Sequence, residues 1–166
     1  PATIQVERWK EYEDALSITL LPPNALRGEV LCEWELLGRS DQSIFVWAFC
    51  QSPAYTEDLP PSVASMPAGI RFGKDGTIQR VEVPGSGTAY ARDVREMFPP
   101  DVQEIIFRHS IDTEKMKAHI DFRRENPSPP LIVLSAMPPS STTPLPPRAT
   151  IAVITPDAVQ IERWKE

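Results

Sequence analysis

The chain has 166 residues, of which 41% are hydrophobic and 24% are charged, and its formal net charge is -6. This length fits one compact domain, and the apolar content is enough for a core, so the composition excludes a wholly disordered protein. The acidic balance argues against a nucleic-acid-binding protein, and no apolar run approaches the roughly 18 residues that a membrane-spanning helix requires.

Residues 7–20 are predicted to form a helix that ends before two consecutive prolines. The apolar residues of this segment recur at steps of three and four and form one stripe, made of Trp9, Tyr12, Leu16 and Leu20. Its charged residues are expected mostly to face solvent; they are Glu7, Arg8, Lys10, Glu11, Glu13 and Asp14.

Two apolar runs, residues 29–37 and 44–51, flank a short polar loop and predict an antiparallel hairpin. With the turn centred on Asp41, residues whose numbers sum to 82 lie opposite one another. This register places Cys32 opposite Cys50, and it makes one face of the hairpin continuously apolar, with Trp34 opposite Ala48 and Leu36 opposite Val46. The other face carries Phe45, Trp47 and Phe49 opposite Leu37, Glu35 and Glu33.

Residues 52–67 are rich in proline and predict a long loop, and a second hairpin follows over residues 69–72 and 77–83 around an Asp-Gly turn. Helices are predicted over residues 89–98, 101–107 and 113–125, with Thr88 and Asp112 as N-caps of the first and last. The last helix should bury Met116 and Ile120, with Phe122 as a further candidate. Residues 131–134 predict a short buried strand.

These elements predict an α+β fold: an antiparallel sheet of two hairpins and a short C-terminal strand, on which an N-terminal helix and two or three further short helices pack. We expect residues 1–136 to form a single domain. Residues 137–149 are rich in Pro, Ser and Thr and predict an extended, semi-rigid linker. Residues 150–166 predict a β-prone segment followed by the start of a second repeat or a docking tail.

The two ends of the chain repeat each other, since residues 1–11 and 156–166 are identical at seven of eleven positions. The simplest interpretation is a tandem array whose second copy begins near Asp157. Alternatively, both ends dock at equivalent places in a swapped assembly, or the repeat is an accident of the chain boundaries. The β-prone residues 150–154 would then pair with the sheet edge of a neighbouring copy, so we expect partners to be copies of this chain that bind through residues 137–166.

Cys32 and Cys50 are the only cysteines, and their opposed positions suit a cross-strand disulfide. The alternative is a pair of buried free thiols in a cytosolic protein, but the Pro/Ser/Thr linker favours an exported protein. A functional interpretation would pair His109 or His119 with Asp112 or Glu114 as an acid/base or metal site. The two histidines are ten residues apart, however, and are not expected to face each other. The sequence predicts no catalytic residue, cofactor or metal site.

Phe45 and Trp47 share a strand face near the long loop that carries Tyr55, and together these three residues are a candidate contact surface. The alternative is that helices cover this face of the sheet. The segment 85–88, Gly-Ser-Gly-Thr, is interpreted as a tight turn rather than as an anion-binding loop, because no complete phosphate-binding motif is present.

Five short patterns resemble an uncharacterised domain of exported or lipoprotein-like bacterial proteins. They are Trp-Lys-x-Tyr-Glu at 9–13, Val-Leu-Cys-Glu-Trp-Glu at 30–35, Val-Trp-Ala-x-Cys at 46–50, Tyr-Ala-x-Asp-Val-Arg at 90–95 and Phe-Pro-x-Asp-Val-Gln-Glu at 98–104. The resemblance covers residues 7–135 and implies an extracytoplasmic location and modular, linker-joined use. It implies no activity and transfers no functional residues.

The sequence therefore predicts a non-catalytic extracytoplasmic interaction or structural module, used as one unit of a tandem array or of a self-assembling surface structure. The alternative is a small-ligand-binding or hydrolytic domain with its site in the 52–67 loop. That alternative requires Tyr55, Glu57 or Asp58 to converge near the Gly85–Gly87 turn.

Overall fold

The computed structural model describes residues 6–26, 28–54, 60–131 and 133–134. Within them, five strands form one sheet in the order β4-β3-β2-β1-β5. They are β1 (Leu31–Arg39), β2 (Ser43–Gln51), β3 (Val63–Phe72), β4 (Ile78–Glu82) and β5 (Val133–Leu134). Each strand from β1 to β4 pairs antiparallel with the next one along the chain, whereas β5 pairs parallel with β1. Strands β4 and β5 therefore occupy the two outer positions of the sheet.

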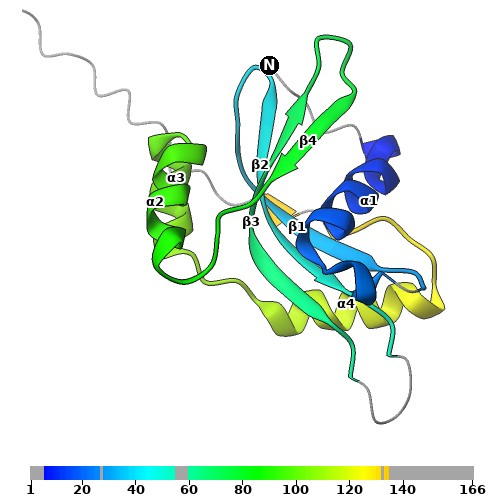
Figure 1. Cartoon of the computed structure of the whole chain (residues 1–166). Coiled ribbons are helices and arrows are strands. Elements are labelled where there is room, and N and C mark those ends of the chain that lie inside the picture. The colour runs from blue at the N-terminus through cyan, green and yellow to red at the C-terminus, as the bar shows by residue number, and fades with distance from the viewer. Residues whose placement is uncertain (1–5, 27, 55–59, 132, 135–166) are drawn as a thin grey trace, which may run out of the picture.

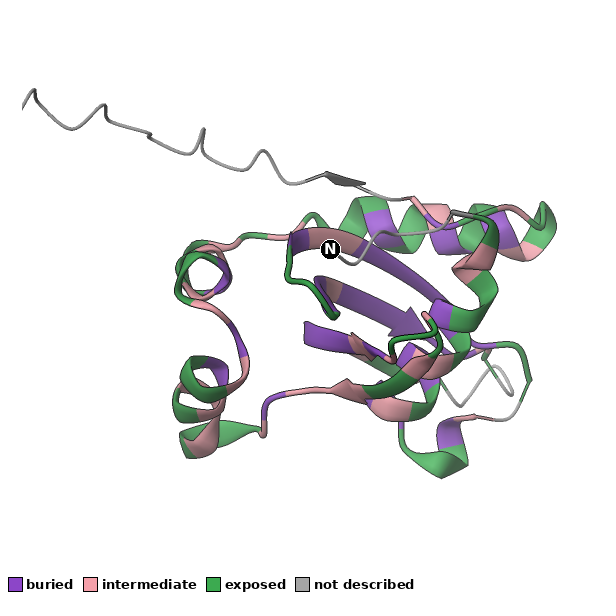
Figure 2. Ribbon diagram, turned by 90° about the horizontal axis from the view of Figure 1, so that it is seen from above, coloured by how far each residue is buried: buried purple, intermediate pink, exposed green. Residues whose placement is uncertain are grey.

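The helices of the described residues cover both faces of this sheet, with α1 on one face and α2, α3 and α4 on the other (Figures 1 and 2). Their bounds are α1 (Trp9–Leu20), α2 (Tyr90–Met97), α3 (Pro100–Arg108) and α4 (Thr113–Glu125). Single 3-10 turns precede α1 (η1, Val6–Arg8), follow it (η2, Pro23–Ala25) and precede α2 (η3, Gly87–Ala89). This arrangement confirms the predicted α+β fold.

The predicted register of the first hairpin is confirmed from Cys32 opposite Cys50 to Leu36 opposite Val46. Beyond that pair a bulge shifts the register, so that Gly38 and not Leu37 lies opposite Phe45. A Cβ atom on Gly38 would lie 2.6 Å from Cγ2 of Val102 in α3. The missing side chain therefore lets α3 pack directly against the end of β1.

The alternation of side chains along the strands divides the core into two layers. On one face, α1 buries its predicted stripe against even-numbered residues of the first hairpin and the end of β3; this layer contains Tyr12, Leu16, Leu20, Cys32, Trp34, Ile44, Val46, Ala48, Cys50, Ala68, Ile70 and Phe72. On the other face, α2 and α3 cover Leu37 and Phe45, while α4 covers Leu31 and Phe49.

The predicted loop over residues 52–67 is too long, because β3 begins at Val63. Pro67 lies inside this strand, opposite Trp47. Strand β4 pairs with β3 only from Gly69 onward, so no strand of the described residues lies beside Pro67 on that side. A missing N–H is tolerated at such an edge, which explains how a proline can occupy the strand.

Helix α4 begins as predicted, with the Asp112 side chain accepting a hydrogen bond of 3.0 Å from the third N–H of the helix. Met116 and Ile120 are buried as predicted. Phe122 is instead 53% exposed, and the buried residue of the last turn is Arg123. This reversal results from the ionic contacts of Arg123 described below.

The predicted cap at Thr88 is wrong, because no side chain caps η3 or α2. The turn is held by Asp93, whose Oδ2 accepts a 2.9 Å hydrogen bond from the Gly85 N–H. Residues 1–5, 27, 55–59, 132 and 135–166 lie outside the described residues, and they include the predicted linker and the second copy of the repeated segment.

Candidate functional site

The predicted disulfide between Cys32 and Cys50 is confirmed, and both residues are fully buried. The two Cα atoms are 4.1 Å apart, as in a directly opposed pair that exchanges no backbone hydrogen bonds. In such a pair the N–H and C=O groups point away from the partner strand. The backbone of Cys32 therefore faces the outer edge of β1.

Side chains, rather than a strand, bond to this part of the β1 edge. The two described residues of β5 pair with Glu35 and Leu36, and Cys32 lies three positions before this contact. The Cys32 N–H donates to Oε1 of Glu13 at 2.8 Å, and the Cys32 carbonyl accepts from Nη1 of Arg123 at 2.9 Å. Two charged side chains thus take the place of a neighbouring strand.

Arg123 also links the two helical layers through buried ion pairs. Its Nη2 lies 2.9 Å from Oε1 of Glu13 in α1, and its Nη1 lies 3.0 Å from Oε1 of Glu33 in β1. Its Nε donates to the carbonyl of Ser128 at 2.8 Å, and its guanidinium lies 5.2 Å from the ring centre of Trp9. The Arg123 side chain is 1% exposed, and those of both glutamates are fully buried.

The burial of Glu13 overturns its predicted solvent-facing position. It neighbours Tyr12 on the buried side of α1, and Lys10 approaches its second oxygen at 3.3 Å. We call Glu13, Glu33, Arg123 and His119 the buried ionic cluster. Its charges and backbone partners satisfy one another, and the cluster joins α1, β1 and α4 across the edge of the sheet.

Each histidine contacts a glutamate of β1. His119 Nδ1 lies 2.9 Å from Oε1 of Glu33, and His109 Nε2 lies 2.9 Å from Oε2 of Glu35 without the alignment of a hydrogen bond. The two glutamates are two positions apart and share one face of the strand. The sequence did not predict these pairs. In the described part of the chain, no group of three or more His, Cys, Asp or Glu residues could hold a metal ion.

The three residues of the candidate aromatic contact surface differ in their surroundings. Phe45 is 5% exposed and packs 5.6 Å from Phe98, so the helices cover it. Trp47 is half-buried, donates from Nε1 to the Ser65 hydroxyl at 3.0 Å and lies 5.2 Å from the His109 ring. Tyr55 lies outside the described residues, as do Glu57 and Asp58 of the alternative site.

The Gly85–Gly87 turn, the other part of that alternative site, already has an acidic partner. The hydrogen bond from the Gly85 N–H to Asp93, followed in strength by the bond from Arg92, lowers the pKa of the Asp93 carboxyl. An ionised carboxylate therefore occupies the position that an anion would need at this N–H.

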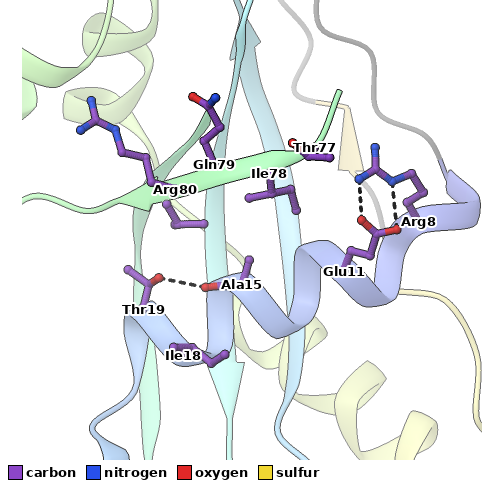
Figure 3. A pocket seen from close by; sticks show the side chains of 10 residues that line it. Arg8, Glu11, Ala15, Ile18, Thr19, Thr77, Ile78, Gln79 and Arg80 are labelled. Atoms are coloured by element: carbon purple, nitrogen blue, oxygen red, sulfur yellow. Dashed lines mark hydrogen bonds and ion pairs between the residues drawn. The ribbon is translucent and has the colours of Figure 1, made fainter. Parts of the chain in front are cut away.

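A shallow, open groove of about 460 Å³ lies between the first helical segment and β4 (Figure 3). We call it the α1–β4 groove. Five consecutive residues, 77–81, line one side of it. Neighbouring side chains of a strand point to opposite faces, and Figure 3 shows Ile78 directed toward α1 and Gln79 directed away. The groove therefore runs along the backbone edge of β4.

The floor of the α1–β4 groove is apolar and its ends are charged. Ala15 and Ile18 of α1 lie across from Ile78 and Val81 of β4, and Ile18 is 67% exposed. Arg8 and Glu11 lie at one end, where the hydrogen bond from Arg8 lowers the pKa of the Glu11 carboxyl. Arg80 and Thr19 lie toward the other end (Figure 3).

No protein-family model, curated protein or solved structure matches the chain. Among the described residues, no helix is both long enough and apolar enough to cross a bilayer.

Sequence reasoning missed the α1–β4 groove, although two signals for it were present. Ile18 is apolar but lies outside the stripe of α1, and the second strand of the second hairpin is a natural edge strand. What the sequence did not indicate is that α1 and β4 lie side by side.

Proposed function

We propose that the chain is a non-catalytic interaction module of the extracytoplasmic space that assembles with copies of itself. The observation that carries this proposal is the outer edge of β4, on which no strand of the described residues lies and which borders an apolar groove with an exposed isoleucine, Ile18. An unpaired strand edge offers backbone N–H and C=O groups to a strand of another chain.

The extracytoplasmic location is supported by the Cys32–Cys50 disulfide. Stable disulfides form in oxidising compartments and are rare in the reducing cytosol. Both cysteines are fully buried beneath α1, so this disulfide is part of the core rather than a reactive surface bond. The resemblance to domains of exported bacterial proteins agrees with this location.

The repeated segment supports assembly from several copies of the domain. In the N-terminal copy, Arg8 donates to the carbonyl of Gly76 at 2.8 Å and Trp9 packs over Arg123. These residues thus hold the start of α1 against distant parts of the same domain. The same Glu-Arg-Trp-Lys-Glu sequence recurs at residues 162–166, and so encodes contacts suited to a second domain of this kind.

The proposal is tested by the mass of the full-length chain in solution as a function of protein concentration. Sedimentation velocity without reductant should show a weight-average mass that rises with concentration. The variant Ile151→Asp, which places a charge in the β-prone segment, should weaken the association at least about tenfold, or about 1.4 kcal/mol.

Leu145→Asp is the matched control, because it introduces the same charge into the Pro-rich segment before residues 150–154. It should associate like the wild-type chain. A wild-type chain that remains monomeric at every accessible concentration would contradict the proposed function.

A further inference from the structure

We infer that the α1–β4 groove receives residues 150–154 of a second copy of the chain as an added strand beside β4. This inference rests on the proposed function and names the surface and the segment through which the copies would bind.

The backbone of β4 provides the first argument. Its inner edge pairs with β3 from Glu82 opposite Gly69 to Ile78 opposite Phe72, while no strand of the described residues lies on its outer edge. The groove follows that outer edge over residues 77–81. The guest segment, Thr-Ile-Ala-Val-Ile at 150–154, has the same number of residues as β4 and is rich in β-branched side chains.

The side chains of the groove provide the second argument. Ile78 and Val81 are only partly buried against the core layer beneath α1. Ile18 of α1, which is 67% exposed, also lines the groove. An added strand would present alternate apolar side chains to these three residues and extend that core layer outward by one strand.

The position of β5 favours a second copy over the chain's own segment. The chain leaves the sheet at β5, beside β1, and β4 lies at the opposite side of the sheet, about 19 Å away at the usual spacing of four strands. Residues 135–149 contain Pro138, Pro139, Pro144, Pro146 and Pro147. Such a composition predicts a stiff, extended linker, and stiffness disfavours the turn that would bring residues 150–154 back to β4 of the same copy, so it favours a second copy.

Contacts of this kind are head to tail, because the groove of one copy binds the segment of the next. Head-to-tail contacts produce open chains unless the rotation between copies closes a ring. They also predict that the groove and the guest segment can be inactivated in separate variants, and that a mixture of the two variants restores one contact.

The test uses two full-length variants, each defective in one half of the contact. Ile18→Asp places a charge in the groove, and Ile151→Asp places one in the guest segment. Each variant alone should associate at least about tenfold more weakly than the wild-type chain. An equimolar mixture should form a complex of two chains and no larger species, because one intact groove and one intact segment remain in each pair.

Phe122→Asp is the matched control for the groove, since Phe122 is 53% exposed on α4 at the opposite face of the sheet. It should associate like the wild-type chain. Thermal unfolding of all three variants checks that the exposed substitutions leave the fold intact. The species are sized by sedimentation velocity and light scattering.

The possible results separate the two proposals. Wild-type association that is lost in Ile151→Asp but retained in Ile18→Asp overturns the groove as the docking site and leaves the proposed function standing. A wild-type chain that never associates overturns both proposals, including the case in which residues 150–154 bind their own domain. A mixture that fails to form the two-chain complex overturns the head-to-tail contact.

Discussion

At the β1 edge of the sheet, the backbone of Cys32 is bonded to Glu13 and Arg123, and these side chains are almost inaccessible to solvent. At the β4 edge, the backbone borders an open groove, and the nearest arginine on the strand, Arg80, is 61% exposed in its side chain. Both edges carry an arginine paired with a glutamate. The difference lies in what each pair contacts: the pair at the β1 edge bonds to the backbone of Cys32, whereas the pair at the β4 edge faces water.

This difference shows how a small sheet can restrict where another strand adds. An exposed edge is a template for unwanted pairing, and proteins protect such edges with charges, bulges or covering elements. Here the buried ionic cluster closes the β1 edge at Cys32, three positions before the contact with β5. We propose that strand addition takes place at β4 instead, where the adjoining groove is lined by apolar side chains.

The sharpest test of the comparison is to remove the arginine from each edge. Arg123→Ala should lower the free energy of unfolding by about 3–5 kcal/mol, because it leaves two buried glutamates without their guanidinium. Arg80→Ala removes an exposed ion pair and should cost at most about 1 kcal/mol. Urea unfolding followed by circular dichroism measures both values. Equal losses would show that the two edges do not differ.

The second test concerns the Cys32–Cys50 disulfide, which joins β1 to β2 next to the buried ionic cluster. Unfolding in the presence of reductant should lower stability by about 3 kcal/mol, the value for a loop of this length. The double variant Cys32→Ala/Cys50→Ala is the control, because reductant should leave its stability unchanged. A wild-type chain that is equally stable with and without reductant would remove the disulfide as a source of stability.

Hydrogen exchange compares the two edges directly at the level of single N–H groups. The Cys32 N–H, bonded to buried Glu13, should exchange at least about a hundredfold more slowly than the outward-facing N–H groups of β4, a difference of about 2.7 kcal/mol. The measurement is made at a protein concentration where the chain is monomeric. Similar rates at both edges would mean that the Glu13 contact does not protect the β1 backbone.

The smallest expected effect is the pH dependence of stability that Lys10 contributes through its contact with Glu13 of the buried ionic cluster. Burial alone would lower the pKa of Lys10, but the carboxylates of Glu13, Asp14 and Glu29 together raise it above its ordinary value of 10.5. The stabilisation is therefore fully present below pH 10.5 and is lost as the pH rises through the higher pKa of the folded state.

Since the Lys10 side chain is 48% exposed, this contribution should be below about 0.5 kcal/mol. The stability of the wild-type chain and of Lys10→Met, compared from pH 8 to about pH 12, isolates it from other titrating groups. The difference between the two proteins should shrink above pH 10.5. A difference that grows with pH would contradict the assigned contacts.

The fold was predictable from the sequence wherever a short-range pattern decided it. The alternation of β1 and β2 determined their register, because a shift by one residue would have exposed Trp34 and the apolar residues on its face. The stripe of α1 and the cap at Asp112 were similarly local. The bulge at Gly38 was not predictable, since its cause is the approach of Val102 from a distant helix.

The buried ionic cluster was not predictable for the same reason. Glu13 and Arg123 are 110 positions apart, and each lies in a helix that is otherwise rich in solvent-facing charges. One signal did exist, because Glu33 lies opposite Phe49 on a face that helices were likewise expected to cover. A carboxylate at such a position requires a positively charged partner, but the sequence does not say which one.

The disulfide has a mechanical consequence as well. It joins Cys32 to Cys50 across 18 positions of the chain, so a pulling force that enters at either end bypasses the hairpin between them. When the domain is stretched, that hairpin cannot extend, and the unfolded chain is shorter by roughly 60 Å than its residue count would allow. In a tandem array of such domains, each unfolded copy would therefore extend less under tension. The residues between the two cysteines would stay in a closed loop for as long as the disulfide is intact.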